Sequence, residues 1–541
     1  MLRWRNRKQK SEKTQKQSLQ EFDYQFIDDL KSVKISASLE ENKDFLNEMF
    51  ADCSDFVIRE FYIERSAKAI FFFVDGLVNT QSANEAMKTL MVIEGKEYLI
   101  ERILETSLPV TQTQQADNYA DMLKSVLGGD VGLIVEGNTQ CILMGIRGME
   151  KRSIQEPETE AVIRGPREGF VENLRTNTSM VRRKLKTPRL KMKPMTIGRE
   201  SNTSIVITYM EDIADPALVD EVLCRLEKID IDAILETGYL EELIQDSAFS
   251  PFPQIQYTER PDMVAAALLQ GRVGIIVDGT PFVLLVPFVF AEALHATEDY
   301  YERFQMMTLI RWLRYVLLVL SLLTPGLYVA FTTFHQDLLP TSLLLSVAAS
   351  REAIPFPAVV EAFIMETTFE ALREAGIRLP KTIGAAVSIL GALVIGQAAV
   401  QAGIVSAPMV IVVSLTGIAS FTIPRFNAAI AIRILRFPIM IAAAIFGLYG
   451  ILICIMLLLG HLANLRSFGV PYLSPFGPIS SNDMKDAMFR APWWSLKERP
   501  SFMTLKDSTR QGDELSKEIK EQGGQRGMSI QHDNEDRGNV E

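Results

Sequence analysis

The sequence predicts an α/β N-terminal region of two related subdomains, followed by an α-helical polytopic membrane domain. The first reason is the uneven placement of charge. Charged residues make up 23% of the 541 residues, yet several long apolar stretches in the C-terminal half have none. The second reason is a weak internal repeat in the N-terminal half, where similar apolar runs and helical patterns occur twice. A chain of this length accommodates two or more domains.

Three uncharged stretches define the predicted membrane domain. Residues 382–424 contain no charged side chain, and residues 315–331 and 437–459 are uncharged and strongly apolar. A hydrocarbon core about 30 Å thick requires about 20 apolar residues per helix. The window 312–461 is therefore expected to cross a membrane several times rather than to form the core of a soluble protein.

Composition divides the chain into five parts. They are a basic arm, expected to be disordered, at 1–35; a first α/β subdomain with a connecting arm at 36–190; a second α/β subdomain at 191–304; a membrane domain of four or five helices at 305–464; and a polar tail at 465–541, expected to be largely disordered at its end.

The N-terminal arm is basic. Seven of its first sixteen residues are Lys or Arg and one is acidic. Such a segment either lies on anionic lipid or is a solvated tail, and the sequence favours neither. No apolar segment typical of a secretory signal follows the arm. The N-terminal region is therefore expected to stay in the cytosol.

The internal repeat relates two pairs of stretches. VGLIVEGNTQCIL at 131–143 matches VGIIVDGTPFVLL at 273–285, and AIFFFVDG at 69–76 parallels SIVITYME at 204–211. Helical patterns accompany both copies, at 84–90 and 117–127 in the first and at 218–226 and 261–269 in the second. Glu136 and Asp278 occupy equivalent places before a glycine, where hairpin turns favour such residues. We expect a turn role for both carboxylates rather than a catalytic one.

Several classes of function are disfavoured. The net charge of −11 argues against a nucleic-acid partner, which requires a basic face. The four cysteines and four histidines are scattered without metal-ligand spacing, so no metal and no cofactor are expected. No nucleophile with a neighbouring base and no phosphate-binding glycine pattern stands out. An enzyme is therefore the least expected class.

One family shares many stretches of this chain at once. They are EPETEAVIRGPREGFVENLRTN (156–177), SPFPQIQYTERPD (250–262), VDGTPFVLLVP (277–287), DYYERF (299–304), HQDLLPTSLL (335–344), REAIPFP (351–357), LREAGIRLP (372–380) and VIGQAAV (394–400). In combination, over roughly residues 40–480, the chain resembles the A subunit of GerA-type spore germinant receptors.

The resemblance implies a place and partners. Such receptors lie in the inner membrane of dormant spores and combine this A subunit with a transporter-like B subunit and a lipoprotein C subunit. Nutrients trigger them and ions leave the spore core, with nutrient recognition assigned mainly to the B subunit. The A subunits are thought to form a homo-oligomeric ring, a pentamer in family models, around a central pore.

The segment GAAVSILGALVIGQAAVQAG at 384–403 is long enough to cross a membrane but is thin and slightly polar. At 100° per residue, one stripe carries bulkier and polar residues. It comprises Val387, Leu390, Gly391, Val394, Gln397, Ala398 and Gln401. The opposite stripe is small and includes Ser388, Ala392 and Gly396, which suits close helix packing.

Two interpretations of this segment follow. In a ring of copies, Val394 would form an apolar constriction, with Gln397 and Gln401 wetting one mouth, and such constrictions gate by dewetting. Alternatively, the segment packs within one subunit and its glutamines bond to neighbouring helices. The sequence alone favours packing, and the resemblance favours the pore.

Acidic residues interrupt the preceding helical segment at 356–376. They are Glu361, Glu366, Glu370 and Glu374. Charges at membrane depth cost about 2.5–3.5 kcal/mol each on insertion scales, so they usually pair or line water. Either this helix lies at the membrane surface with its acids in water, or the acids attract cations to the pore or pair with arginines of neighbouring subunits.

The orientation follows from basic residues. Arg303, Arg311 and Arg314 precede the first span, which places the N-terminal region in the cytosol by the positive-inside rule. An odd number of spans would place the tail on the other side, and the resemblance favours a cytosolic tail.

The sequence supports three functions in turn. The first is a receptor subunit of the spore inner membrane that converts nutrient binding elsewhere into ion release. The second is a solute carrier subunit that moves the nutrient itself, although the window 312–461 shows no repeat of the kind that carriers contain. The third is a non-conducting scaffold.

Overall fold

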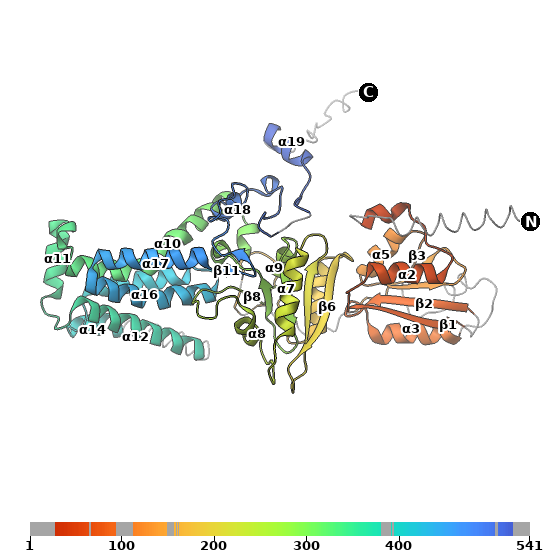
Figure 1. Cartoon of the computed structure of the whole chain (residues 1–541), viewed down its shortest axis with the longest axis horizontal. Coiled ribbons are helices and arrows are strands. Elements are labelled where there is room, and N and C mark those ends of the chain that lie inside the picture. Colours follow the sequence, from red (N-terminus) through yellow and green to blue (C-terminus); the bar gives the residue numbers. More distant parts are fainter. Residues whose placement is uncertain are drawn as a thin grey trace, which may run out of the picture.

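The computed structural model describes residues 27–63, 67–92, 112–148, 156–157, 159–160, 162–379, 391, 394–503 and 507–522. These residues form an elongated molecule (Figure 1). An N-terminal α/β unit lies at one end, a second α/β unit lies in the middle, and a bundle of long helices forms the other end.

The first unit is a five-stranded antiparallel sheet with helices on both faces. Its strands are β1 (Phe56–Ile63), β2 (Ala67–Val74), β3 (Thr113–Ala116), β4 (Val131–Val135) and β5 (Cys141–Met144), in the order β1-β2-β4-β5-β3. Helices α2 (Leu39–Met49) and α5 (Tyr119–Leu127) pack on one face. Helix α3 (Thr80–Val92) packs on the other.

The second unit repeats this arrangement. Its strands are β6 (Leu190–Ile197), β7 (Thr203–Met210), β8 (Gln256–Thr258), β9 (Val273–Val277) and β10 (Val283–Val286), in the order β6-β7-β9-β10-β8. Helices α6 (Leu174–Lys184) and α9 (Pro261–Leu268) cover one face. Helices α7 (Pro216–Glu227) and α8 (Thr237–Ile244) cover the other. The strand orders correspond position by position, which confirms the two related subdomains.

Equivalent polar contacts show how the repeat is built. The Asn42 amide bonds the backbone N–H and C=O of Ser36, and the Asn177 amide bonds those of Val171 in the same way. Glu136 accepts a hydrogen bond from the Leu39 N–H, the first residue of α2. Asp278 does the same for Leu174, the first residue of α6. These carboxylates therefore hold helix N-termini, where exposed N–H groups favour negative charge.

The unit boundaries differ from the expected ones. Helix α6 packs on the second sheet, although the sequence analysis placed it in the first subdomain because its N-terminal half belongs to a charged, turn-rich stretch. The expected arm also ends earlier: residues 27–32 form a 3-10 helix, η1, and Leu30 and Ile35 are buried in the first core. Residues 1–26 lie outside the described residues.

A buried ion pair joins the two α/β units. Arg182 of α6 donates two hydrogen bonds to Asp55, of 2.7 and 2.8 Å, and both side chains are buried. Beside them, the Met192 N–H bonds the Asp52 C=O, and the Ser54 N–H bonds the Met192 C=O. The first unit is thus attached to the second through backbone and charged groups together.

The helical bundle follows. Its helices are α10 (Phe304–Thr333), α11 (Thr341–Arg351), α12 (Ala358–Arg378), a π-helical turn (Val394–Ala398) continued by α14 (Ala399–Gln401), α15 (Ala407–Phe421), α16 (Phe426–Phe446) and α17 (Leu448–Asn464). Among the described residues, α10 and α16 have the length and apolar composition of membrane spans, and α15 and α17 are shorter apolar helices.

The C-terminal segment returns to the α/β side of the bundle. It contains a two-stranded ribbon of β11 (Arg466–Ser467) and β12 (Val470–Pro471), then α18 (Met484–Ala487), η6 (Trp493–Ser495) and α19 (Glu514–Gln522). Tyr472 is buried beside Phe252 and Phe288 of the second unit. The segment at 465–503 is therefore packed structure, and residues 523–541 lie outside the described residues.

Candidate functional site

The acidic residues of α12 meet partners within the same chain. At the end of the bundle remote from the sheets, Glu361 is buried and pairs with Arg351 at 3.1 Å. Its other oxygen accepts hydrogen bonds from the N–H and hydroxyl of Ser406, of 3.0 and 2.8 Å. Glu361 therefore ties the start of α12 to the start of α15.

The next acid, Glu366, lies fully inside the bundle. It pairs with Arg436 of α16 through a single bond of 2.6 Å, and each side chain is only 1% exposed. Among the described residues, the second Glu366 oxygen and two of the Arg436 nitrogens, Nε and Nη2, have no hydrogen-bond partner. The pair is thus buried but only partly satisfied.

Glu370 connects two arginines. It pairs with Arg433 of α16 at 2.9 Å and with Arg373, one turn along α12, at 3.3 Å. Arg373 also donates a 2.9 Å hydrogen bond to Ser420 of α15, and its guanidinium lies over the ring of Phe421. The last acid, Glu374, pairs with Arg378 at the exposed end of α12.

These contacts differ from both interpretations drawn from the sequence. Glu361 and Glu366 are buried rather than in water, and the arginines that meet the acids belong to this chain rather than to a neighbouring subunit. The sequence analysis had used Arg433 and Arg436 only to mark the cytosolic side. Their i,i+3 spacing, facing the i,i+4 spacing of Glu366 and Glu370, is the signal that could have identified the pairs.

The candidate pore segment is described in part. Val387, Ser388, Leu390 and Ala392 lie outside the described residues, as does the side chain of Val394. Gln397, Ala398 and Gln401, which are on the predicted pore stripe, are exposed.

The two glycines of this segment face neighbouring helices. Gly391, also assigned to the pore stripe, lies against Leu372 of α12, which a Cβ at position 391 would contact far too closely. Gly396, assigned to packing, faces Val410 of α15. Residues 394–398 form a π-helical turn, whose i→i+5 bonds change the rotation per residue, so stripes drawn at 100° do not continue through it.

A polar cluster joins α10 to the second α/β unit and the C-terminal segment. Asp299 is buried and pairs with Arg314 at 2.8 Å and with Arg311 at 3.3 Å. Arg311 also reaches Asp486, while the Trp312 indole donates to the Met488 carbonyl at 3.0 Å. The first turns of α10 are thus held by both the connecting segment and the end of α18.

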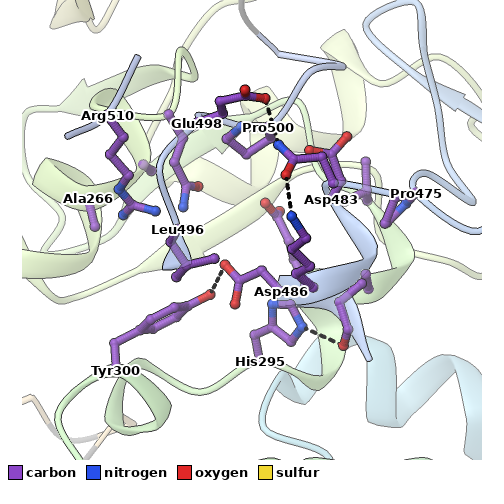
Figure 2. A pocket seen from close by; sticks show the side chains of 18 of the residues that line it. Ala266, His295, Tyr300, Pro475, Asp483, Asp486, Leu496, Glu498, Pro500 and Arg510 are labelled. Atoms are coloured by element: carbon purple, nitrogen blue, oxygen red, sulfur yellow. Dashed lines mark hydrogen bonds between the residues drawn. The ribbon is translucent and has the colours of Figure 1, made fainter. Parts of the chain in front are cut away.

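A cavity of about 190 Å³ lies beside this cluster (Figure 2). On one wall, Asp486 accepts a 2.9 Å hydrogen bond from the Tyr300 hydroxyl, and His295 contacts the Ala487 carbonyl. Burial lowers the pKa of His295 well below its ordinary value, so its ring is neutral at pH 7. Arg510 and Leu496 contribute the opposite wall. The cavity walls come from three parts of the chain, so any relative movement of these parts changes its shape.

The contacts at the two ends of the bundle fix the direction of each helix. Arg311 and the ion pair of Arg425 with Glu160 mark the α/β side, as does the Ser250–His461 contact of 2.9 Å. The start of α10 and the end of α17 therefore lie at the same end, so the chain passes along the bundle an even number of times. Five passes are excluded.

No catalytic or metal centre emerges from the described residues. In the part of the chain that the structure describes, no group of three or more His, Cys, Asp or Glu side chains is arranged to hold a metal ion. The four cysteines are free thiols, two of them buried. The chemistry available to the bundle is therefore that of paired charges and of the exposed amides at Gln397 and Gln401.

Comparison with known proteins identifies the family. The family model described as Bacillus/Clostridium GerA spore germination protein matches residues 44–502. The chain belongs to the GerA family. The matched range includes both α/β units, the whole bundle and the C-terminal segment as far as residue 502.

Named relatives of this GerA-family chain match over most of its length. The uncharacterized membrane protein YfkQ of Bacillus subtilis (strain 168) is 50% identical over 476 residues, covering 88% of this chain and 93% of that protein. Spore germination protein KA of the same organism is 47% identical over 485 residues, 89% of each chain. A crystal structure of the N-terminal domain of the A subunit of the Bacillus megaterium spore germinant receptor GerK3 is 36% identical, with a TM-score of 0.39, over 48% of this chain and 97% of that one.

Proposed function

We propose that this chain is the A-type subunit of a nutrient-responsive germinant receptor of the spore inner membrane. In this proposal several copies form a ring, and the bundle opens a path through which ions leave when a nutrient binds. The α/β units and the C-terminal segment lie in the cytosol, and B-type and C-type subunits complete the receptor. The family membership and the names of the relatives support the receptor role.

One observation supports the ion path in particular. The bundle pairs the α12 acids with arginines of its own helices, so they are not free to line a passage. Beside them, the segment that continues into α14 presents the uncharged amides of Gln397 and Gln401 on its exposed surface. Uncharged polar groups next to an apolar constriction wet the entrance of a pore without binding an ion tightly.

The polar cluster at the start of α10 supplies the coupling in this proposal. Arg311 contacts the connecting segment through Asp299 and the C-terminal segment through Asp486. A displacement of either segment therefore acts on α10, which contacts both α15 and α16 along its length. The nutrient signal would reach the bundle through these contacts.

The test is ion release from spores that carry Val394→Ala or Gln397→Ala in the full receptor. We expect Val394→Ala to release ions without nutrient, because a smaller side chain widens and wets the constriction. Ile411→Ala, at an exposed position of α15, is the matched control and should stay closed.

The same spores separate the alternatives. If Val394→Ala assembles in normal amounts, stays closed without nutrient and responds normally with it, segment 384–403 is a packing element and the pore assignment fails. Uptake of labelled nutrient through the receptor, with no ion release, would instead indicate a carrier.

A further inference from the structure

A patch of large apolar side chains lies exposed on the second α/β unit, outside the bundle. It consists of Leu235, Tyr239, Leu243 and Phe249, with exposed fractions of 67%, 44%, 51% and 102%. We call this set the α8 patch, because Tyr239 and Leu243 lie on helix α8, and Leu235 and Phe249 lie in the loops on either side. Contiguous exposed apolar surface in a soluble unit marks an interaction site.

The opposite face of α8 explains why the patch is directed outward. Thr237, Leu240 and Ile244 are buried, and the latter two belong to the core under the second sheet. Tyr239 and Leu243, four residues apart, share the other face. Helix α8 is therefore apolar on both sides, which a helix bordered by water on one side does not require.

The loop after α8 fixes the position of the patch against the bundle. The Ser250 hydroxyl lies 2.9 Å from His461 in the last turn of α17, and Phe252 is buried with its ring centroid 6.2 Å from that of His461. Glu241 of α8 contacts the Asn427 amide at 3.5 Å, at the start of α16. The patch thus borders the α/β-side ends of α16 and α17.

The surface of these helices continues the patch. Met456, Leu457 and Leu459 of α17 are exposed, as is Phe426 at the start of α16. On a membrane helix these residues face lipid, and the apolar surface ends at His461. Aromatic residues are enriched at this level, where the hydrocarbon meets the headgroups. Phe249 and Tyr239 lie where such an aromatic belt would be.

The acidic residues around the patch are compatible with this level. Asp246 is paired with Arg225 at 2.7 Å, and Glu242 is exposed between Tyr239 and Leu243. Burial raises the pKa of Glu241 to about 7, so this carboxyl is about half protonated at neutral pH. The surface close to the helices therefore carries less negative charge than its sequence indicates.

We propose that the α8 patch inserts into the headgroup–acyl boundary of the bilayer that surrounds the bundle and anchors the second α/β unit to the membrane surface. The proposal rests on the membrane position of the bundle. Four side chains are too few for a stable protein interface, which uses about 20–30 residues on each side. They suffice for an interfacial anchor, which needs only a few aromatic and aliphatic groups.

The test uses the full chain in lipid nanodiscs, with the accessible thiols removed by Cys224→Ser and Cys454→Ala and one spin label introduced at a time. Phe249→Cys probes the patch and Leu457→Cys probes a side chain on α17 that is expected to face lipid. Tyr62→Cys, an exposed position on β1 in the first unit, is the aqueous control. Oxygen reports lipid and a water-soluble nickel chelate reports solvent.

We expect the ratio of oxygen to nickel accessibility at 249 to exceed that at 62 and to lie below that at 457. A ratio at 249 equal to that at 62 overturns the anchor, provided that 457 reports lipid. Protection of 249 from both reagents also overturns it, because a protein partner then covers the patch. If 457 itself reports solvent, the membrane position of the bundle fails, and with it the proposed function.

Discussion

The Glu366–Arg436 pair offers a direct test of how charges are held inside the bundle. Both side chains are 1% exposed and share one hydrogen bond of 2.6 Å. The perturbations are Glu366→Met and Arg436→Met alone, and the two together. The exposed pair of Glu374 and Arg378 on the same helix, with side chains 59% and 77% exposed, serves as control through Glu374→Gln.

The structure sets the expected sizes. Removing one partner leaves a buried charge without compensation, which costs about 3–5 kcal/mol. The double variant also removes the three polar atoms that lack partners, namely Glu366 Oε1 and Arg436 Nε and Nη2. Unsatisfied buried groups cost about 1–3 kcal/mol each, so we expect the double variant to be within about 1 kcal/mol of wild type or more stable. The exposed control should change stability by less than about 1 kcal/mol.

The assay is thermal unfolding of the purified full-length protein in detergent, followed by the loss of its monodisperse gel-filtration peak. The reasoning predicts strongly lowered unfolding temperatures for both single variants and recovery in the double. Two single variants that behave like the Glu374→Gln control would refute it, because no buried charge would then have been left unpaired. A double variant that loses as much as the sum of the singles would also refute it.

Two further predictions concern the α/β units. Arg182→Met should lower the unfolding free energy by about 3–5 kcal/mol, because it leaves Asp55 buried and unpaired at the junction of the units. Thermal unfolding should show no such loss for Arg199→Met, whose pair with Asp230 is exposed. Because burial raises the pKa of Glu241 to about 7 from its ordinary 4.5, folding stability should fall as pH rises from 4.5 to 7. Glu241→Gln should remove that fall and stabilise the protein by up to about 3 kcal/mol at about pH 8, with little change at about pH 5; equal shifts at both values would contradict the assignment.

The duplication of the α/β region could be predicted because its signal is local. Buried strands such as 131–135 and 273–277 are continuous apolar runs, and each is followed by a glycine with positive φ, Gly137 or Gly279, that closes a hairpin. The extent of each unit could not be predicted in the same way. Helix α6 has little apolar character, and its membership of the second unit depends on contacts of Met180 and Val181 with a sheet that follows it in sequence.

The bundle was less accessible to sequence reasoning. Apolar length indicates that a helix can cross a membrane, but it does not indicate which helix faces which. The acids of α12 could be placed on one face, yet their partners lie about 70 residues later on α16, at Arg433 and Arg436, and no periodicity connects the two segments. The π-helical turn at 394–398 was also invisible, since a helical wheel assumes one rotation per residue throughout.

The order of the pairs shows what the buried charges contribute. Along α12 the acids run from Glu366 to Glu370, while their partners on α16 run backwards from Arg436 to Arg433, as antiparallel helices require. Contacts between small side chains tolerate sliding, because each turn of such a helix resembles the next. Two ion pairs do not tolerate it: a shift of α12 by one turn would bring Glu366 towards Arg433 and leave Arg436 alone in the bundle. The pairs therefore set the register of α12 against α16. Through Gly391, which lies against Leu372, α12 in turn positions the segment that carries Gln397 and Gln401.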